Sequence, residues 1–206
     1  MEEQKRITLA LAVLGLLMPV LCMVFNLAFG GQYNEPQFLT SISASHYSSA
    51  YLLFEGLLFS MGVLFFLLRG KTRLDTALYI IAGACSLLLA LFPCFREAED
   101  YRNFVMASPE VAHQVHFVMS ILLFACYVLI IGFRFTRKEG APARQKKARN
   151  KLSIICAILI AASVVIGYVG KNMLNIEIAL YVGEVIAFWS FGLAFLAKGG
   201  VILKDK

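Results

Sequence analysis

The stretch ITLALAVLGLLMPVLCMVFNLAFG, residues 7–30, decides the class of fold to which this chain belongs. It contains no charged residue, and a helix of this length crosses a hydrocarbon core about 30 Å thick. Lys5 and Arg6 precede it, as in a secretory signal, but such a signal has an apolar core of only about 7–15 residues. We therefore interpret 7–30 as a retained transmembrane helix, and Pro19 predicts a kink within it.

Five further apolar segments follow along the chain, at 48–68, 76–95, 112–133, 152–171 and 176–197. Only 16% of the residues are charged, whereas about a quarter are charged in soluble domains, and the mean hydropathy is +0.76. These features predict an all-α polytopic membrane protein. We expect residues 1–206 to form one domain of six transmembrane helices.

Lysine and arginine are distributed unequally between the two sides of the predicted bundle. Sixteen of the nineteen lie near the N-terminus, in segments 69–73 and 134–151, or after residue 197. The other three are Arg96, Arg102 and Lys171. By the positive-inside rule, both termini are expected in the cytoplasm. No aromatic residue follows Phe135 in the basic loop 134–151, so we expect no nucleic acid to bind there.

The three histidines and the carboxyl groups in the interior of these segments all belong to the second, fourth and sixth predicted helices. They are His46, Glu55, His113, His116 and Glu184. At about 1.5 Å of rise per residue, Glu55 should lie roughly 13 Å deeper than His46. The serine-rich stretch SISASHYSS, residues 41–49, would stand at the outer rim. We therefore predict an outward-facing polar pocket among helices 2, 4 and 6.

The first functional hypothesis is that this pocket binds a membrane lipid or a small amphiphilic molecule without bond chemistry. The ligand-binding residues would then be Ser41, Ser43, His46, Tyr47, Glu55, His116 and Glu184.

The second hypothesis is a metal-dependent lipid hydrolase embedded in the membrane. His46, His113 and His116 could supply three nitrogen ligands to zinc and leave a fourth position for water. Glu55 and His116 are the candidate catalytic residues. The competing interpretation places His113 and His116 at the membrane interface and treats Glu55 and Glu184 as hydrogen-bonded packing groups.

The third hypothesis is an oligomeric channel or pore in which Glu55 and Glu184 line the path. Composition and spacing leave the three hypotheses open.

The region from about residue 40 to 135 resembles a family of uncharacterised bacterial multi-pass membrane proteins. The matching residues are Ser41-Ile42-Ser43, Tyr47, Gly56, Gly62, Arg69-Gly70, Asp75, Ala82-Gly83, Leu91-Phe92-Pro93, His116 and Phe124. The resemblance implies six helices and a bacterial inner membrane, but no activity. His113 and Glu184 lie outside the matching pattern.

A second resemblance is to membrane hydrolases of the alkaline ceramidase and adiponectin receptor type. Those proteins place a serine shortly before a zinc-binding histidine, as Ser43 precedes His46 here. Their paired histidines have the spacing His-x-x-x-His in the last of seven helices. In this chain the pair is His113-x-x-His116, in the fourth of six, so spacing and position both differ.

Overall fold

The computed structural model describes residues 2–29, 38–94, 107–137 and 144–204. The last residues of two predicted helices, Gly30 and Phe95, lie outside the described residues. So do Arg96, Arg102 and the segment 138–143 of the basic loop.

The described residues form helices and no strand, which confirms the all-α prediction. The α-helices are α1 (Glu2–Phe29), α2 (Tyr51–Leu67), α3 (Arg73–Leu91), α4 (Pro109–Leu129), α5 (Arg144–Asn172) and α6 (Ala179–Lys198). A short 3₁₀ helix, η2 (Ser43–Tyr47), precedes α2, and a π-helical turn, η4 (Ile130–Arg134), continues α4. Pro19 lies inside α1 without ending it.

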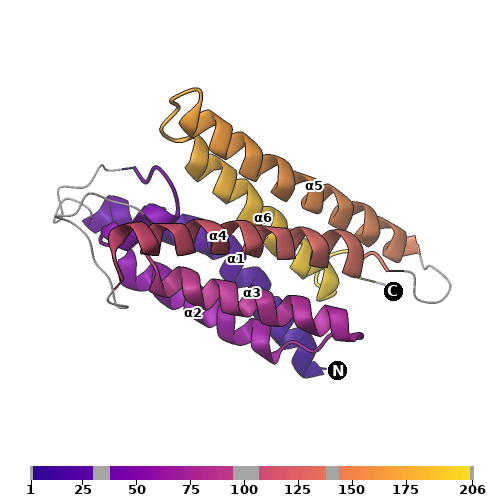
Figure 1. Ribbon diagram of the computed structural model, residues 1–206. Helices are drawn as coiled ribbons and strands as arrows, with labels where there is room; N and C mark the ends of the chain where they lie inside the picture. Colours follow the sequence, from indigo (N-terminus) through magenta and orange to yellow (C-terminus); the bar gives the residue numbers. More distant parts are fainter. Residues whose placement is uncertain (1, 30–37, 95–106, 138–143, 205–206) are drawn as a thin grey trace.

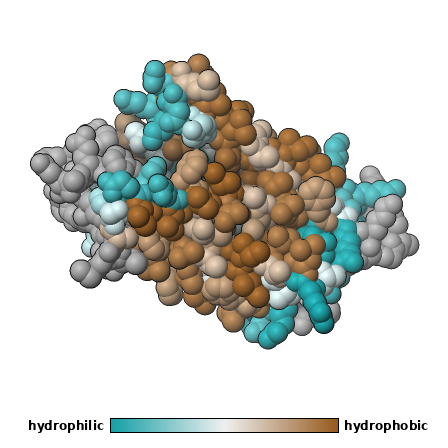
Figure 2. Space-filling model, in the orientation of Figure 1, coloured by the Kyte–Doolittle hydropathy of each residue, from teal (hydrophilic) through white to brown (hydrophobic). Residues whose placement is uncertain are grey.

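Length and composition give the bundle the character of a multi-pass membrane protein. Five of the described helices are long and apolar enough to cross a membrane: α1, α3, α4 with η4, α5 and α6. The apolar helix α2 is shorter, with 17 residues, because it begins at Tyr51 rather than at residue 48. Figure 2 shows apolar side chains covering the middle of one face, with hydrophilic residues at both ends.

The helices pack in chain order, and α6 returns to pack against α1 (Figure 1). Both termini lie at one end of the bundle, which we call the basic end. The start of α3, the end of α4 and the start of α5 lie there too. The opposite, distal end holds the segment 38–50, the end of α3, the start of α4 and the turn between α5 and α6. The candidate site lies at this distal end.

Glycines allow close approach between neighbouring helices, as small residues do in membrane proteins. A Cβ atom on Gly62 of α2 would lie 3.0 Å from the carbonyl oxygen of Gly83 in α3. On α6, a Cβ atom on Gly183 would lie 2.6 Å from the carbonyl oxygen of Ser163 in α5. These contacts between backbones fix the α2–α3 and α5–α6 pairs.

A capping box at the start of α3 ties that helix to the end of α4. Thr72 accepts a hydrogen bond from the Asp75 amide at 3.3 Å, and the Asp75 carboxylate accepts one from the Thr72 amide at 3.0 Å. Arg134, the last residue of η4, donates to the Asp75 carboxylate and, at 2.7 Å, to the Thr72 hydroxyl. These two hydrogen bonds from Arg134 join the end of α4 to the start of α3 at the basic end of the bundle.

Replacing Gly62 by alanine should lower the thermal midpoint in detergent. The added methyl group would press on the Gly83 carbonyl and on Leu87, at a cost of about 1–3 kcal/mol. Gly56, on the same helix, is the matched control because a Cβ atom there would meet nothing within 4 Å. We expect Gly56→Ala to leave the midpoint unchanged or raise it slightly. Equal midpoints for the two variants would contradict the close α2–α3 contact.

Candidate functional site

The serine-rich stretch 41–49 is buried at the distal end rather than exposed at a rim. Ser45 is fully buried, and Ile42 and Ser48 are each 1% exposed. A buried segment outside a long helix must find partners for its backbone groups. Serine side chains supply some of them: Ser41 accepts from the Ala44 amide at 3.0 Å, and Ser48 accepts from the Ala50 amide at 3.1 Å. The serines therefore act as local caps, as their position before an apolar helix indicates.

Glu184 of α6 holds the start of this stretch. Its carboxylate accepts a hydrogen bond from the Ile42 amide and a longer one, at 3.5 Å, from the Ser43 hydroxyl. One turn earlier on α6, the amide of Tyr181 donates to the carbonyl oxygen of Thr40 at 3.0 Å. The N-terminal part of α6 therefore anchors residues 40–43 through both side-chain and backbone contacts.

His46 contacts Glu55 of α2, which does not fit the expectation that Glu55 lies roughly 13 Å deeper than His46. The Nδ1 atom of His46 lies 3.4 Å from a carboxylate oxygen of Glu55. The prediction assumed one continuous helix. Instead, the 3₁₀ helix ends at Tyr47 and Ser48 is extended, with φ −120° and ψ 176°. The chain changes direction there, which brings His46 alongside the first turns of α2.

The other ring nitrogen of His46 also has a partner. Its Nε2 atom lies 3.0 Å from the carbonyl oxygen of Leu89, which can only accept, so Nε2 carries a hydrogen.

The end of α3 receives donors from three other residues. His116 of α4 places Nδ1 2.8 Å from the carbonyl oxygen of Phe92, and the hydroxyl of Tyr47 donates to the carbonyl oxygen of Cys94 at 2.7 Å. His46 contacts the carbonyl oxygen of Leu89, so the two histidines satisfy carbonyl groups that the C-terminus of α3 leaves without partners. The Tyr47 contact holds the residues that follow the helix. Both buried histidines therefore help to cap α3.

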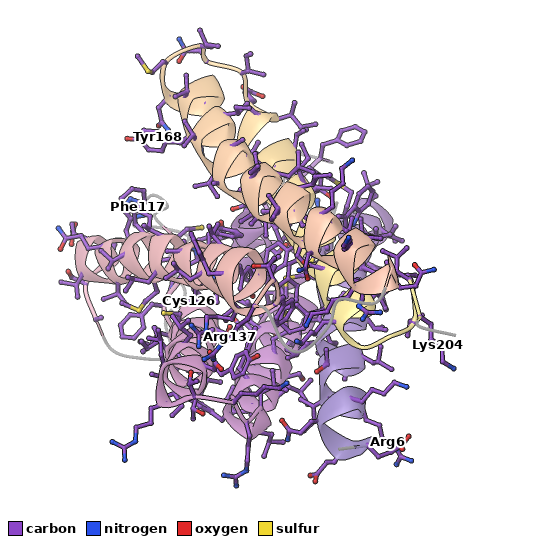
Figure 3. All side chains as sticks on the ribbon, turned by 90° about the vertical axis from the view of Figure 1, so that its right-hand side faces the viewer. Arg6, Phe117, Cys126, Arg137, Tyr168 and Lys204 are labelled. Carbon is purple, nitrogen blue, oxygen red and sulfur yellow. The ribbon has the colours of Figure 1, made fainter. Side chains whose placement is uncertain are left out.

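A pocket of about 620 Å³ lies beside this network, between α4 and the α5–α6 pair. Apolar side chains form much of its wall, among them Phe117, Ile121, Phe124, Val164 and Leu180. The ring centroids of Phe117 and Tyr168 lie 6.3 Å apart, from α4 and α5 respectively, and Figure 3 shows the two side chains facing across the space between those helices. The pocket is therefore bounded by aromatic rings on one side.

Five of the seven predicted ligand-binding residues line this pocket: Ser41, Ser43, Tyr47, His116 and Glu184. His46 and Glu55 do not, because they contact each other and the end of α3. Helix α5 contributes Ser163, Val164, Tyr168 and Lys171 to the lining, whereas the prediction had placed helix 2 there. No pattern in α5 distinguished it, since its only cation on the distal side is Lys171 at the helix end.

The three histidines do not fit a zinc site as they are arranged. His46 and His116 are neighbours, with ring centroids 5.6 Å apart, but both nitrogens of His46 already face protein groups. His113 is exposed, and its ring lies beside that of Phe117. Within the described residues, no group of three or more His, Cys, Asp or Glu side chains could hold a metal ion.

The two carboxylates of the pore hypothesis both contact the same short segment. Glu184 contacts Ile42 and Ser43 from α6, and Glu55 contacts His46 from α2. The described contacts of both carboxylates are therefore with residues of the segment 42–46.

Comparisons of the chain with protein-family models, with curated proteins and with solved structures find no match. The physical features of the site therefore carry the functional argument alone.

Replacing Glu184 by alanine should destabilise the protein by about 1–3 kcal/mol, because the buried Ile42 amide loses its acceptor. Glu184→Gln keeps an acceptor oxygen for the Ile42 amide, so this variant should lose less stability than Glu184→Ala. Glu177→Ala, in the exposed turn before α6, is the control and should change the stability little. Thermal unfolding in detergent measures all three. Equal stability of Glu184→Ala and wild type would contradict the anchoring role.

Replacing His46 by alanine should also destabilise the protein, by about 1–3 kcal/mol, since the Leu89 carbonyl and Glu55 lose a partner.

If the histidines cap α3, adding zinc should leave the thermal midpoint of the wild-type protein unchanged. A zinc-dependent rise in the wild type that disappears in His116→Ala would instead support the metal hypothesis.

Proposed function

We propose that the distal pocket binds a lipid or a small amphiphilic molecule. The observation that carries the proposal is the combination of apolar and polar lining residues in a single pocket of about 620 Å³. Small-molecule sites are commonly about 300–1,000 Å³ in volume and combine apolar lining with a few polar groups.

The polar groups of the pocket are suited to the head of an amphiphile. Glu184 presents a carboxylate, and Lys171, at the end of α5, presents an ammonium group. Ser41, Ser43 and Ser120 line the same pocket and add hydroxyl groups. Such a set can pair with a head group that carries both an anionic and a cationic or hydroxyl part.

The apolar wall is suited to a chain or ring system. Phe117 and Ile121 of α4 line the pocket and are also 44% and 48% exposed at the bundle surface. In a bilayer, that surface would face the lipid chains. An amphiphile could therefore reach the pocket from the membrane between α4 and α5 without crossing the packed helices.

The membrane setting completes the proposal. We propose that α2 crosses the bilayer together with the five longer helices, because it is apolar and packs between α1 and α3. On this proposal both termini lie in the cytoplasm of a bacterial cell and the distal pocket lies on the outer side of the inner membrane, and the concentration of cations at the basic end supports that orientation.

Filling the pocket should weaken binding. Ser120 lines the pocket on α4, and Ser120→Phe would place a ring inside it. Val118, on the same helix, is 47% exposed and is not among the lining residues, so Val118→Phe is the matched control. A fluorescent lysophospholipid, titrated into protein in mild detergent, should bind Ser120→Phe about tenfold more weakly than wild type or Val118→Phe.

The proposal fails if the wild-type protein does not bind the probe, or if Ser120→Phe binds it as tightly as the wild type. Equal weakening by Val118→Phe would also contradict it, because the probe would then be on the outer surface of the bundle.

A further inference from the structure

We propose that a second pocket, at the basic end, binds the phosphate of an anionic phospholipid. This pocket has a volume of about 810 Å³ and lies between the start of α1, the α2–α3 turn, the end of α4, the start of α5 and the end of α6. Figure 3 looks onto this end of the bundle, where Arg6, Arg137 and Lys204 are labelled. It is separate from the distal pocket, so the two proposals stand independently.

Cations predominate among the charged residues of this pocket. Nine of the described lining residues are lysine or arginine and two are acidic, Glu2 and Asp75. One of the two carboxylates, that of Asp75, is already paired with Arg134. Like charges gathered in one cavity repel each other, and a bound anion relieves that repulsion. The pocket therefore selects an anion.

The backbone around these cations is held by contacts that need no ligand. The side-chain amide of Gln4 on α1 donates to the Leu67 carbonyl at 3.1 Å and accepts from the Arg69 amide at 2.7 Å, which fixes the turn after α2. Arg149 of α5 donates to the carbonyl oxygen of Leu203 at 2.7 Å, which holds the segment after α6. The cationic side chains thus start from fixed positions on several elements, as a preformed anion site requires.

The floor of the pocket indicates a lipid rather than a free anion. Phe135, which is 9% exposed, and the half-buried Tyr79 line it, and Lys198 lies over the Phe135 ring at 5.1 Å from its centroid. The Phe195 ring, 5.0 Å from that of Phe135, is fully buried beneath this surface. Inorganic phosphate gains nothing from such a floor, whereas the glycerol and upper chains of a phospholipid would cover it. Basic pockets between helices at the edge of a bilayer are suited to anionic head groups.

Two triple variants test this proposal because they remove the same residue types and the same charge. The first, Lys5→Gln, Arg69→Gln and Arg137→Gln, removes cations that line the pocket. The second, Arg6→Gln, Arg73→Gln and Lys147→Gln, removes cations that are not among its lining residues. Native mass spectrometry of the full chain in neutral detergent, titrated separately with phosphatidylglycerol and phosphatidylcholine, measures the lipid preference.

We expect the wild type to bind phosphatidylglycerol about tenfold or more tightly than phosphatidylcholine. The pocket variant should lose this preference and the control variant should keep it. Inorganic phosphate in large excess should displace little of the phosphatidylglycerol.

Three results would overturn the proposal. The wild type could show no preference between the two lipids, or both triple variants could lose it equally, which would indicate diffuse surface charge. Alternatively, inorganic phosphate could bind as well as the lipid and depend on the same three cations, which would assign the pocket to a soluble anion. Thermal unfolding of both triple variants shows whether a lost lipid preference comes from loss of the site or from loss of the fold.

Discussion

The contact between Glu184 and the Ile42 amide is the interaction on which the distal half of the structure depends. Residues 39–50 enter the bundle without forming a long helix, and most of them are buried. In an apolar surrounding, each backbone group without a partner would cost several kcal/mol. The Glu184 carboxylate on α6 lies where the buried segment begins and accepts a hydrogen bond from one of these groups, the Ile42 amide. The serines at 41 and 48 satisfy two more of these groups from within the segment, because they accept hydrogen bonds from the Ala44 and Ala50 amides.

This arrangement also explains why polar residues gather beside the distal pocket. The segment 41–47 lies between α6 and α2 and reaches the end of α3, where His46, Tyr47 and His116 donate to carbonyl groups. It therefore forms a polar side to the space between α4 and the α5–α6 pair. The same residues that satisfy the buried backbone present Ser41, Ser43 and Glu184 to that space. Structural and binding roles thus coincide in one short stretch.

The all-helical fold could be predicted from the sequence because apolar length and sparse charge leave little alternative for a chain in a membrane. Five of the seven proposed binding residues also line the distal pocket, because they lie on one side of the bundle. The contact between His46 and Glu55 could not be predicted, since it depends on a change of chain direction at Ser48. Nor could the part played by α5, because its pocket residues, Ser163, Val164, Tyr168, Lys171 and Asn172, form no pattern that stands out in the sequence. The basic pocket appeared in the sequence only as a bias in charge, because its cations come from segments far apart in the chain.

Hydrogen exchange at the Ile42 amide tests the central claim most directly, because that amide donates to the Glu184 carboxylate that holds the start of the buried segment against α6. The amide should exchange slowly in the wild-type protein in detergent or nanodiscs, and much faster in Glu184→Ala, while amides in the middle of α6 remain protected in both. Rapid exchange at Ile42 in the wild type, or equal protection in the variant, would contradict the account.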